Sequence, residues 1–446
     1  MSDFTSQLTQ NSRLLTLEDW LKHIESLHPK SIAMGLDRVN EVKQRLLLDL
    51  DFPVITVAGT NGKGSSCAML ERIYLDAGYS VGCYTSPHLL HYNERVRING
   101  LEANDAALCS AFAAVEQARE NTELTYFESG TLAAIWLFKK MQLDIAILEV
   151  GLGGRLDAVN AFEPSCTIVT SVALDHMEFL GNSRESIGFE KAGIFRKGVP
   201  AICGDANPPA TLVTHAQAIG ADFQLIQQYF GFYSTDESWT YREETPQKLP
   251  TEIADLPFPA LKGDFQLHNA ACVIAAIQAL QTRLPVNHSQ MVSGLKAVNI
   301  AGRFQRVDSH PQIILDVAHN PHAALALVEN LRHLPCSGRT LAVFAMLADK
   351  DIAGVIHAVK SQINAWYVAD IDHARGAKAS QLVDSICQQI PDCTVAGFSN
   401  VILAFRQAYK EAAENDRIIV FGSFFTVADI MRVLGGQSAK QALNLG

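Results

Sequence analysis

Several features that would place a protein in a specialised class are missing from this chain of 446 residues. Its nine cysteines are scattered singly, with no C-x-x-C pair, which excludes cysteine-based zinc sites and favours reduced thiols over a disulfide framework. The chain has no sustained basic run and its formal net charge is −11, so we expect no nucleic-acid partner. An anionic ligand must therefore be held by a local group of side chains.

Long apolar stretches and a targeting segment are missing as well. No run approaches the roughly 18 apolar residues that span a bilayer. The start, MSDFTSQLTQ, lacks the basic and then apolar layout of a signal peptide. Hydrophobic residues still make up 48% of the chain, which is enough for large cores, and a usual domain size of about 150 residues suggests two or three domains. We therefore expect a cytoplasmic protein without a membrane segment.

Short apolar strands alternating with helices dominate the first part of the chain. The runs PVITVAG, SVGCYTS, DIAILEV, CTIVTSVA and PAICG predict strands, and DAALCSAFAAVEQARE and SGTLAAIWLFKKM predict helices between them. Residues 17–50 are predicted to be helical, and residues 223–256 to form a hairpin-bearing excursion. Helices are expected around 268–282 and 288–297. Strands this apolar indicate a mostly parallel sheet covered on both faces.

A glycine-rich loop follows the first of these strands, in VITVAGTNGKGSSCAML (54–70). It departs from the strict phosphate-loop pattern, because Val57 stands where a glycine is required and Gly64 separates Lys63 from Ser65. The alternative is a strand-to-helix turn without a ligand. We favour a phosphate site, since free N–H groups at a helix start attract anions and Lys63 adds a positive charge.

The alternation of strands and helices restarts at residue 311, where QIILDVA, RTLAVFAM, AWYVADI, CTVAGF and DRIIVFG predict strands. The predicted fold class is therefore α/β. Residues 1–297 are expected to form a P-loop ATPase domain with a mostly parallel sheet, and residues 298–446 a smaller, Rossmann-like α/β C-terminal domain.

Ligands of parallel sheets bind beyond the carboxyl ends of the strands, and several polar residues lie there. Ser86 ends one strand, in TSPHLL, and Glu149 ends another, in DIAILEVGLGGRLDA. An acid at a strand end beside a phosphate loop suits Mg²⁺, although a structural carboxylate is nearly as good an explanation. Asp175 and His176 follow a third strand. His176 as a core or surface residue, and Lys191 as a solvated helix lysine, remain open alternatives.

A second group of polar residues belongs to the C-terminal half. Asp316, His319 and Asn320 lie in ILDVAHNPHAA, between a predicted strand and a helix, and Arg303 lies at the domain junction. A hydrolytic triad of Asp316, His319 and Ser423 is disfavoured, since the chain has no G-x-S-x-G elbow and a phosphate loop has no part in that chemistry. The zinc pattern H-E-x-x-H is absent too.

Eight motifs, taken together and in this order, resemble an ATP-dependent amide ligase of the Mur ligase superfamily: GTNGKGS, SPHL, TYFESGT, LEVGLGGRLDAVN, LDH, EKAGIF, AGRFQ and DVAHNP. Within it, the chain is most similar to the folylpolyglutamate synthase family in its bacterial form with combined dihydrofolate synthase activity. The resemblance runs from HPKSIAMGLDRV to GSFFTVADI, nearly the whole chain. Each motif alone is weak, but eight in order are specific.

The resemblance implies a role for each part of these motifs. The residues it places on ATP are Thr60, Asn61, Gly62, Lys63, Asn269, Arg303 and Asp316. Two Mg²⁺ sites are implied, with the ligands Ser86, Glu149, His176 and Lys191. Lys191 would carry a carbamate derived from CO₂, and the residues expected to be catalytic are Lys63, Lys191 and His319. The pterin-carrying substrate is expected against Ser31, Ile32, Ala33, Thr125, Tyr126, Phe127, Glu128, Leu156, Asp157 and Ala158.

The reaction that the resemblance implies joins L-glutamate to dihydropteroate and to reduced folates through an acyl phosphate, with ATP as co-substrate. These small molecules are the expected partners, and a monomer is expected. One residue departs from the pattern: bifunctional members typically have an acid in the segment SIAMGLDRV, where this chain has Ala33. We expect the dihydropteroate activity nonetheless, because TYFE fits the bifunctional form.

Other classes of protein explain the motifs less well. A Mur ligase of peptidoglycan synthesis would need a UDP-sugar-binding domain ahead of the loop, and only 53 residues precede Val54. A switch or motor ATPase would not need a second α/β domain with DVAHNP and an arginine at the junction. A degenerate nucleotide-binding scaffold would not be expected to keep every ligand residue.

Overall fold

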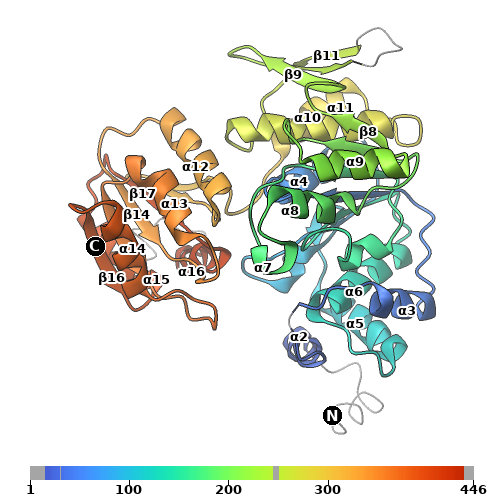
Figure 1. The fold of residues 1–446 in the computed structure, drawn as a ribbon, viewed down its shortest axis with the longest axis horizontal. Helices are drawn as coiled ribbons and strands as arrows, with labels where there is room; N and C mark the ends of the chain where they lie inside the picture. The colour runs from blue at the N-terminus through green and yellow to red at the C-terminus, as the bar shows by residue number, and fades with distance from the viewer. Residues whose placement is uncertain (1–15, 31, 245–250, 436–446) are drawn as a thin grey trace.

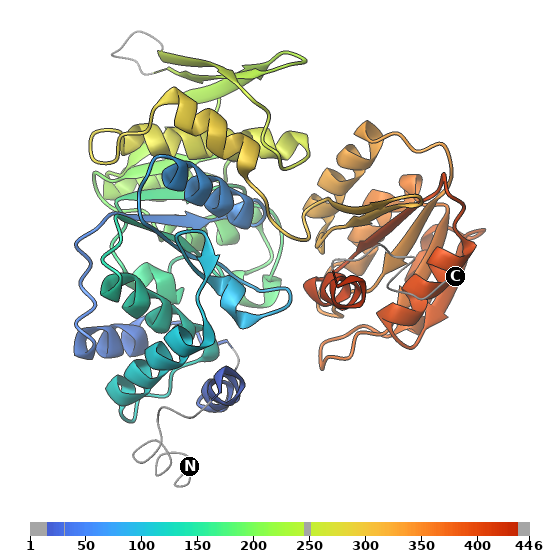
Figure 2. The ribbon, with the colours of Figure 1, turned by 180° about the vertical axis from the view of Figure 1, so that it is seen from behind.

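Two large sheets organise the molecule: the first contributes to one hydrophobic core, and the second has a core on each face (Figures 1 and 2). The computed structural model describes residues 16–30, 32–244 and 251–435. The last helix of the first unit ends at Ala297, and the second sheet begins at Gln305. Within the described residues, no helix is both long and apolar enough to cross a membrane.

The first sheet has eight strands in the order β4-β3-β2-β5-β1-β6-β7-β8. The six from β2 to β8 run parallel, and β3 and β4 extend the edge antiparallel. The central strands β1 and β5 are buried at every residue, as expected of a sheet with both faces covered. The strands are β1 (Val54–Ala58), β2 (Val81–Tyr84), β3 (Val96–Ile98), β4 (Leu101–Glu102), β5 (Ile145–Glu149), β6 (Cys166–Val169), β7 (Pro200–Cys203) and β8 (Asp222–Leu225).

Helices cover both faces of this sheet. Figures 1 and 2 show α10 (Asp264–Ala279) and α11 (His288–Ala297) on one side and α5 (Asp105–Arg119) and α6 (Tyr126–Lys140) on the other. Helix α4 (Lys63–Asp76) packs against α10 and α11. The other helices in the described part of this unit are α2 (Leu17–Ser26), α3 (Asp37–Arg45), α7 (Met177–Leu180), α8 (Arg184–Ala192) and α9 (Ala210–Ile219), with the 3-10 turns η1 (Tyr92–Arg95) and η2 (Ala158–Ala161).

A small antiparallel sheet projects beside α10. It consists of β9 (Phe230–Ser234), β10 (Trp239–Glu243) and β11 (Thr251–Leu256), in the order β11-β10-β9. Trp239 and Tyr241 are buried in the main core, so one face of this sheet packs on the body of the unit.

The second unit is built on a six-stranded sheet in the order β12-β13-β17-β14-β15-β16, parallel except for the β12–β13 pair. Alternate residues of β14 belong to two cores: Leu341 and Val343 pack with α15 and α16, and Ala342 and Phe344 pack with α12, α13 and α14. The elements are β12 (Gln305–Ser309), β13 (Gln312–Leu315), α12 (Pro321–His333), β14 (Thr340–Phe344), α13 (Ile352–Val359), η3 (Lys360–Gln362), β15 (Ala365–Ala369), α14 (Ala379–Gln389), β16 (Thr394–Phe398), α15 (Val401–Glu411), β17 (Arg417–Phe421) and α16 (Phe424–Leu434).

The predicted fold class is confirmed: a mostly parallel α/β sheet with the phosphate-type loop, followed by a smaller α/β unit. The expectation of one helical region over residues 17–50 is wrong in part, since α2 and α3 are separated by non-helical chain that contains Pro29 and Gly35, whose φ is +139°. Residues 222–225 form β8 and belong to the main sheet, not to the hairpin excursion. The domain boundary at 297/298 stays a prediction.

Candidate active site

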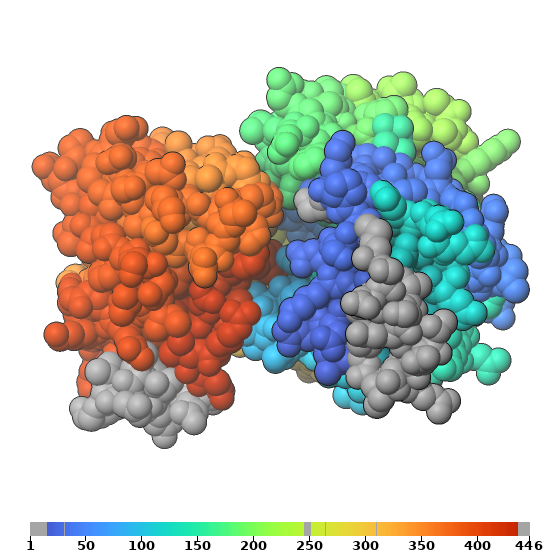
Figure 3. All heavy atoms as spheres, turned by 90° about the horizontal axis from the view of Figure 1, so that it is seen from below, coloured from blue at the N-terminus to red at the C-terminus, as the bar shows by residue number. Residues whose placement is uncertain are grey.

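A cavity of about 1070 Å³ lies between the two units and is lined from both (Figure 3). The first unit contributes the carboxyl ends of β1, β2, β5 and β6, and the second contributes those of β13 and β17. Every predicted site residue lines this cavity except Ser31, which lies outside the described residues. The lining runs from Ile32 to Arg432, and the parts of it that follow parallel strands lie where ligands of such sheets bind.

The loop after β1 has the backbone that a phosphate site needs. Gly59 and Gly62 have φ of +146° and +90°, which side chains rarely allow. A Cβ at Gly59 would lie 1.9 Å from Thr170 Oγ1, and a Cβ at Gly62 would lie 2.4 Å from Asn269 Oδ1. The loop is held in place by the chain that follows β6, where the Thr60 N–H donates to Ser171 O at 2.8 Å. Helix α4 starts at Lys63, so its first N–H groups have no partner inside the helix and face the cavity as an anion site.

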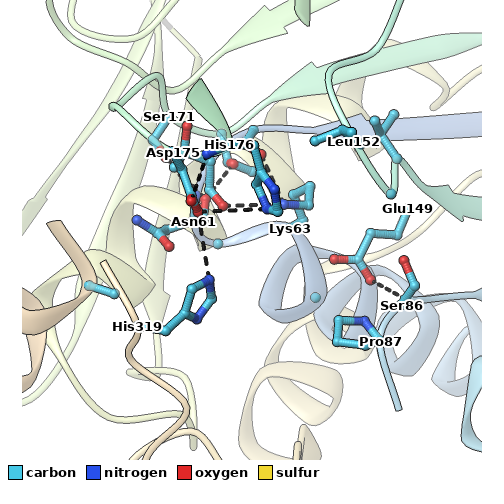
Figure 4. A pocket seen from close by; sticks show the side chains of 18 of the residues that line it. Asn61, Lys63, Ser86, Pro87, Glu149, Leu152, Ser171, Asp175, His176 and His319 are labelled. Atoms are coloured by element: carbon cyan, nitrogen blue, oxygen red, sulfur yellow. Dashed lines mark hydrogen bonds and ion pairs between the residues drawn. The ribbon is translucent and has the colours of Figure 1, made fainter. Parts of the chain in front are cut away.

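Lys63 lies at the centre of the site. Its ammonium donates to Gly59 O at 2.9 Å and to Thr60 O at 3.2 Å. Burial lowers the pKa of Lys63, and the negative charges of Glu149 and Asp175 only partly offset this effect. Figure 4 shows Lys63 between the Asp175–His176 pair and the Ser86–Glu149 pair. A bound phosphate would offer the Lys63 ammonium a negative charge, and its oxygens would accept the hydrogen bonds that the ammonium now donates to the loop carbonyls.

Glu149 and Ser86 face each other at the ends of neighbouring strands β5 and β2 (Figure 4). The Ser86 N–H donates to Glu149 Oε2 at 2.9 Å, and Glu149 is 4% exposed. Burial raises the pKa of the Glu149 carboxyl, while the charge of Lys63 lowers it. Among the described residues, no three His, Cys, Asp or Glu side chains are arranged so that they could hold a metal ion, so a cation here would keep water and substrate oxygens, as Mg²⁺ does.

Asp175 connects the two units through charged contacts. Lys350, from the loop after β14, donates to Asp175 Oδ1 at 2.6 Å, and His319 Nε2 lies 3.6 Å from Asp175 Oδ2. Burial would raise the pKa of Asp175, but the contact with His319, the charge of Lys350 and, at acidic pH, the charge of His176 hold it well below its usual range. The pKa of His176 is lowered to about 4, chiefly by burial, so this imidazole is neutral at pH 7 with Nε2 3.4 Å from Lys350 Nζ.

A neutral hydrogen-bond bridge joins the phosphate-type loop to the second unit. The Asn61 amide donates to Asn320 Oδ1 at 3.1 Å and contacts His322 Nδ1 at 2.8 Å. Asn320 donates back to Asn61 Oδ1 at 3.2 Å and caps α12 by accepting from Ala323 N. The loop that faces the cavity is therefore also part of the contact between the units.

Lys191 is the most unusual charge of the site. It lies in α8 and is only 4% exposed, and within the described part of the chain its ammonium has no hydrogen bond or ion pair. Burial lowers the pKa of Lys191 to about 7, and the nearby charge of Lys63 acts in the same direction. The expectation of a solvated helix lysine, kept open as the alternative above, is wrong. A large share of this amine is neutral, and hence nucleophilic, at pH 7.

Arg303 and Asp316 lie on the side of the second unit. The Arg303 guanidinium stands over the Phe424 ring at 5.4 Å, and the Asp316 carboxylate accepts from Phe304 N and Ala318 N, each at 2.8 Å. His319 Nδ1 contacts Val317 O at 2.8 Å, which leaves Nε2 as the atom directed toward Asp175 (Figure 4). Asn269, from α10, is held by Gln266 at 3.1 Å beside Gly62.

The far end of the cavity is formed by the segments predicted to hold the pterin. Thr125 and Glu128 cap α6 reciprocally, with Thr125 N donating to Glu128 Oε2 at 2.7 Å, and Arg38 pairs with Glu128 at 2.8 Å. Tyr126 and Phe127 line the cavity from this helix start. Burial raises the pKa of Asp157 to about 7, although it accepts hydrogen bonds from Leu152 N and Val159 N.

Sequence reasoning missed several residues of the site. Lys350 and His322 line the cavity and contact Asp175 and Asn61, and Arg95 lines it beside Tyr126. Lys350 follows the predicted strand RTLAVFAM, so the strand-end rule would have selected it. Nothing in the sequence marks His322 or Arg95, because their role depends on contacts across the fold.

The Asp175–Lys350 pair gives a first prediction. Replacing Lys350 by methionine leaves the Asp175 carboxylate buried with one partner fewer, so we expect the free energy of unfolding to fall by about 2–4 kcal/mol. The control is Arg375→Met, which breaks an exposed 3.1 Å pair with Asp349 and should cost less than about 1 kcal/mol. Urea unfolding measures both, and equal losses would contradict a special role for the buried pair.

Comparison with known protein families agrees with the two units. Residues 57–277 match the Mur ligase middle domain, and residues 302–424 match the Mur ligase glutamate ligase domain. The resemblance inferred from the eight motifs is thereby confirmed at the level of the superfamily.

Individual relatives match along almost the whole chain. The dihydrofolate synthase/folylpolyglutamate synthase of Escherichia coli (strain K12) is 45% identical over 421 residues, which cover 94% of this chain and 95% of that protein. The solved structure of E. coli FolC in complex with DHPP and ADP is 44% identical with a TM-score of 0.89, covering 95% of this chain and 98% of that one. A bifunctional folylpolyglutamate synthase/dihydrofolate synthase with Mn, AMPPNP and L-glutamate bound is 42% identical with a TM-score of 0.86, covering 95% and 99%. This chain therefore belongs to the dihydrofolate synthase/folylpolyglutamate synthase family of Mur ligases.

Proposed function

We propose that this chain is an ATP-dependent ligase that joins L-glutamate to dihydropteroate, forming dihydrofolate, and to reduced folates, forming folylpolyglutamates. The observation that carries the proposal is that a phosphate-type loop, a buried strand-end carboxylate and polar residues of both units line one cavity of about 1070 Å³. The relatives compared above are bifunctional synthases by name, and the two solved structures hold DHPP with ADP, or Mn, AMPPNP and L-glutamate.

The reaction needs activation, because a carboxylate is a poor electrophile. An oxygen of the acceptor carboxylate attacks the γ-phosphorus of ATP, and the bond to ADP breaks. The glutamate nitrogen then attacks the acyl carbon of this acyl phosphate and loses a proton. The tetrahedral intermediate collapses with phosphate as the leaving group. Positioning and charge stabilisation supply most of the rate enhancement in such phosphoryl transfers.

The phosphates of ATP are assigned to the loop. The N–H groups at the start of α4, with Thr60, Asn61 and Gly62, surround the oxygens, and Lys63 and Arg303 offset their charge. Lys63 is suited to this role because, among the described residues, its ammonium donates hydrogen bonds only to carbonyl oxygens of its own loop. Asn269 and Asp316 are proposed to contact the nucleoside.

The residues present fit two divalent cations. The buried Glu149 carboxylate with Ser86 offers oxygens at one position, and the neutral His176 offers a nitrogen lone pair at the other. Bound Mg²⁺ would neutralise phosphate charge during transfer. Lys350 Nζ lies 3.4 Å from His176 Nε2, so this ammonium would have to move away from the nitrogen for a metal ion to bind there.

Lys191 is proposed to carry a carbamate. With a pKa of about 7, its neutral amine forms an N–C bond with CO₂ and releases one proton, which converts the neutral amine into a carbamate anion. The carbamate oxygens would then serve as a ligand beside His176, and the buried amine would gain the partner that it lacks. Support comes from the burial of Lys191 and from its place in EKAGIF.

The substrates are assigned to opposite sides of the reacting centre. His319, whose Nε2 is available beside Asp175, is proposed on the glutamate or phosphoryl side. The acceptor is proposed to extend along Ile32, Ala33, Tyr126, Phe127 and the segment 156–158. Thr125 and Glu128 act through the helix cap that positions the two aromatic rings. Asp157 is proposed to accept hydrogen bonds from the pterin.

Further parts of the proposal concern the whole molecule. Residues 1–297 form the ATP-binding domain with the pterin site, and residues 298–446 the glutamate-ligase domain. Closure of the two over the cavity excludes water that would hydrolyse the acyl phosphate. The enzyme is proposed to act as a monomer in the cytoplasm, where ATP and folates are available.

The test is ATP turnover with product analysis. We expect ADP release to require glutamate together with dihydropteroate or tetrahydrofolate, and each product to gain the mass of one glutamyl group. Full hydrolysis without an acceptor, with no amide product, would contradict the proposal. Products from tetrahydrofolate alone would support a folylpolyglutamate synthase without dihydropteroate activity. Ala33, which replaces the acid typical of bifunctional members, would then be the first candidate for the cause. Products from neither would favour another amino-acid ligase of the superfamily.

A further inference from the structure

Arg95 is a positive charge in the cavity that the reaction described above does not use. Four of the cations that line the cavity are already paired with carboxylates: Arg184, Lys350, Arg375 and Arg432. Lys63, Lys191 and Arg303 are assigned to phosphates and metal, and Lys262 is exposed. Within the described residues, Arg95 has no ion pair.

The contacts of Arg95 hold it in place without using up its donors. Its guanidinium stands over the rings of Tyr92 and Tyr126, 5.5 Å from each centroid, and Nε donates to His88 Nδ1 at 2.8 Å. Burial and the charge of Arg95 lower the pKa of His88 to about 4, so His88 is a neutral acceptor. In the described part of the chain the Nη groups make no hydrogen bond, and these are the groups that bind a carboxylate in pairs.

Arg95 also lies between the two ends of the proposed acceptor site. Its carbonyl accepts from Thr85 N at 2.9 Å, one residue before Ser86, which faces Glu149. Its side chain reaches Tyr126, beside Phe127 on the pterin side. An acceptor that runs from the pterin side toward Ser86 would pass the Arg95 guanidinium on its way.

The two acceptors differ in charge at this point. Dihydropteroate has a single carboxylate, which must react, whereas a folate ends in a glutamyl group with two. When one of these reacts at the phosphoryl group, the other lies a few bonds away. We propose that Arg95 binds the carboxylate of the folate that does not react, and is thereby a specificity-determining residue for folates over dihydropteroate. This inference rests on the proposed function.

The experiment compares Arg95→Met and Arg95→Lys with the unmodified protein. We expect the methionine variant to raise KM for tetrahydrofolate about 10- to 100-fold, since a charge-assisted contact is lost, with kcat nearly unchanged. KM for dihydropteroate should change less than about threefold, and the lysine variant should restore part of the tetrahydrofolate affinity. Arg72→Met, an exposed helix arginine outside the cavity, is the matched control.

The same contact with Arg95 can be removed by changing the substrate, with a modified tetrahydrofolate as the acceptor. In a tetrahydrofolate whose non-reacting carboxylate is an amide, the methionine variant and the unmodified protein should have equal KM and equal equilibrium Kd without ATP. Equal losses for dihydropteroate and tetrahydrofolate, or a loss that persists with the amide, would overturn the inference and leave Arg95 as a packing residue between Tyr92 and Tyr126. Turnover of neither acceptor by the unmodified protein would overturn the proposed function itself.

Discussion

Replacing Lys63 by alanine is expected to lower kcat by about 10³-fold or more, with the fold intact. Lys63 is the only positive side chain of the loop, and its ammonium lies where Glu149 and Asp175 act on it from two sides. Without it, the charge that develops on the phosphates must be offset by Arg303 and cations alone. Steady-state kinetics with ATP, glutamate and tetrahydrofolate measures the effect.

The stability of this variant separates a chemical role from a structural one. Burial lowers the pKa of Lys63, which means that folding carries a cost for its charge, so alanine should leave the melting temperature unchanged or raise it. Lys140→Ala, at an exposed position on α6, is the control and should change neither quantity. Near-normal turnover by Lys63→Ala would contradict the assignment of the loop to ATP phosphates.

Replacing Lys191 by alanine is expected to lower kcat by about 10²- to 10³-fold, because the variant cannot form the carbamate that would join His176 in holding a cation. Small carboxylic acids such as acetate or formate should restore part of the activity, since they supply the missing oxygens in the space left by the side chain. Lys197→Ala, exposed beyond the end of α8, is the control and should keep full activity. Full activity of Lys191→Ala in CO₂-free buffer would rule out the carbamate.

The pH dependence of stability tests the same lysine without activity. In the unfolded chain the pKa of Lys191 is near 10.5, and in the folded protein it is about 7, so the unfolded state binds more protons between these pH values. In metal-free, CO₂-free buffer, Lys191→Met should therefore be more stable than the unmodified protein by roughly 3–5 kcal/mol at and below pH 7. The difference should shrink as pH rises toward 10.5. Asp157 also titrates near pH 7 and its charge acts on Lys191, so its titration contributes to the measured difference.

Much of the fold and the outline of the site follow from local patterns. Strands β1 and β5 are apolar at nearly every position and lie between helices, so a covered parallel sheet is the expected solution. The same rule puts Ser86 and Glu149 at one edge of the first sheet and Asp316 at the corresponding edge of the second, and all three line the cavity. Pro29 and Gly35 are helix-breaking residues that the sequence itself shows. The prediction of one helical region over residues 17–50 overlooked them, and the chain forms two helices there.

What could not be predicted depends on contacts between distant residues. The Asn61–Asn320 bridge joins positions 259 residues apart, and no local property of either asparagine indicates the other. Lys191 has the spacing of an ordinary helix lysine, and only the packing of α8 shows that its amine is buried. The neutral state of His176 likewise arises from burial, which tertiary structure alone determines.

The central claim is that the acceptor carboxylate is activated as an acyl phosphate before glutamate attacks. The most direct measurement uses dihydropteroate or tetrahydrofolate labelled with ¹⁸O in the reacting carboxylate, with ATP and L-glutamate, followed by mass spectrometry of the products. The account predicts one ¹⁸O atom in the released phosphate for each amide bond formed, and none in ADP. Phosphate without label, or label in a nucleotide product, would contradict it.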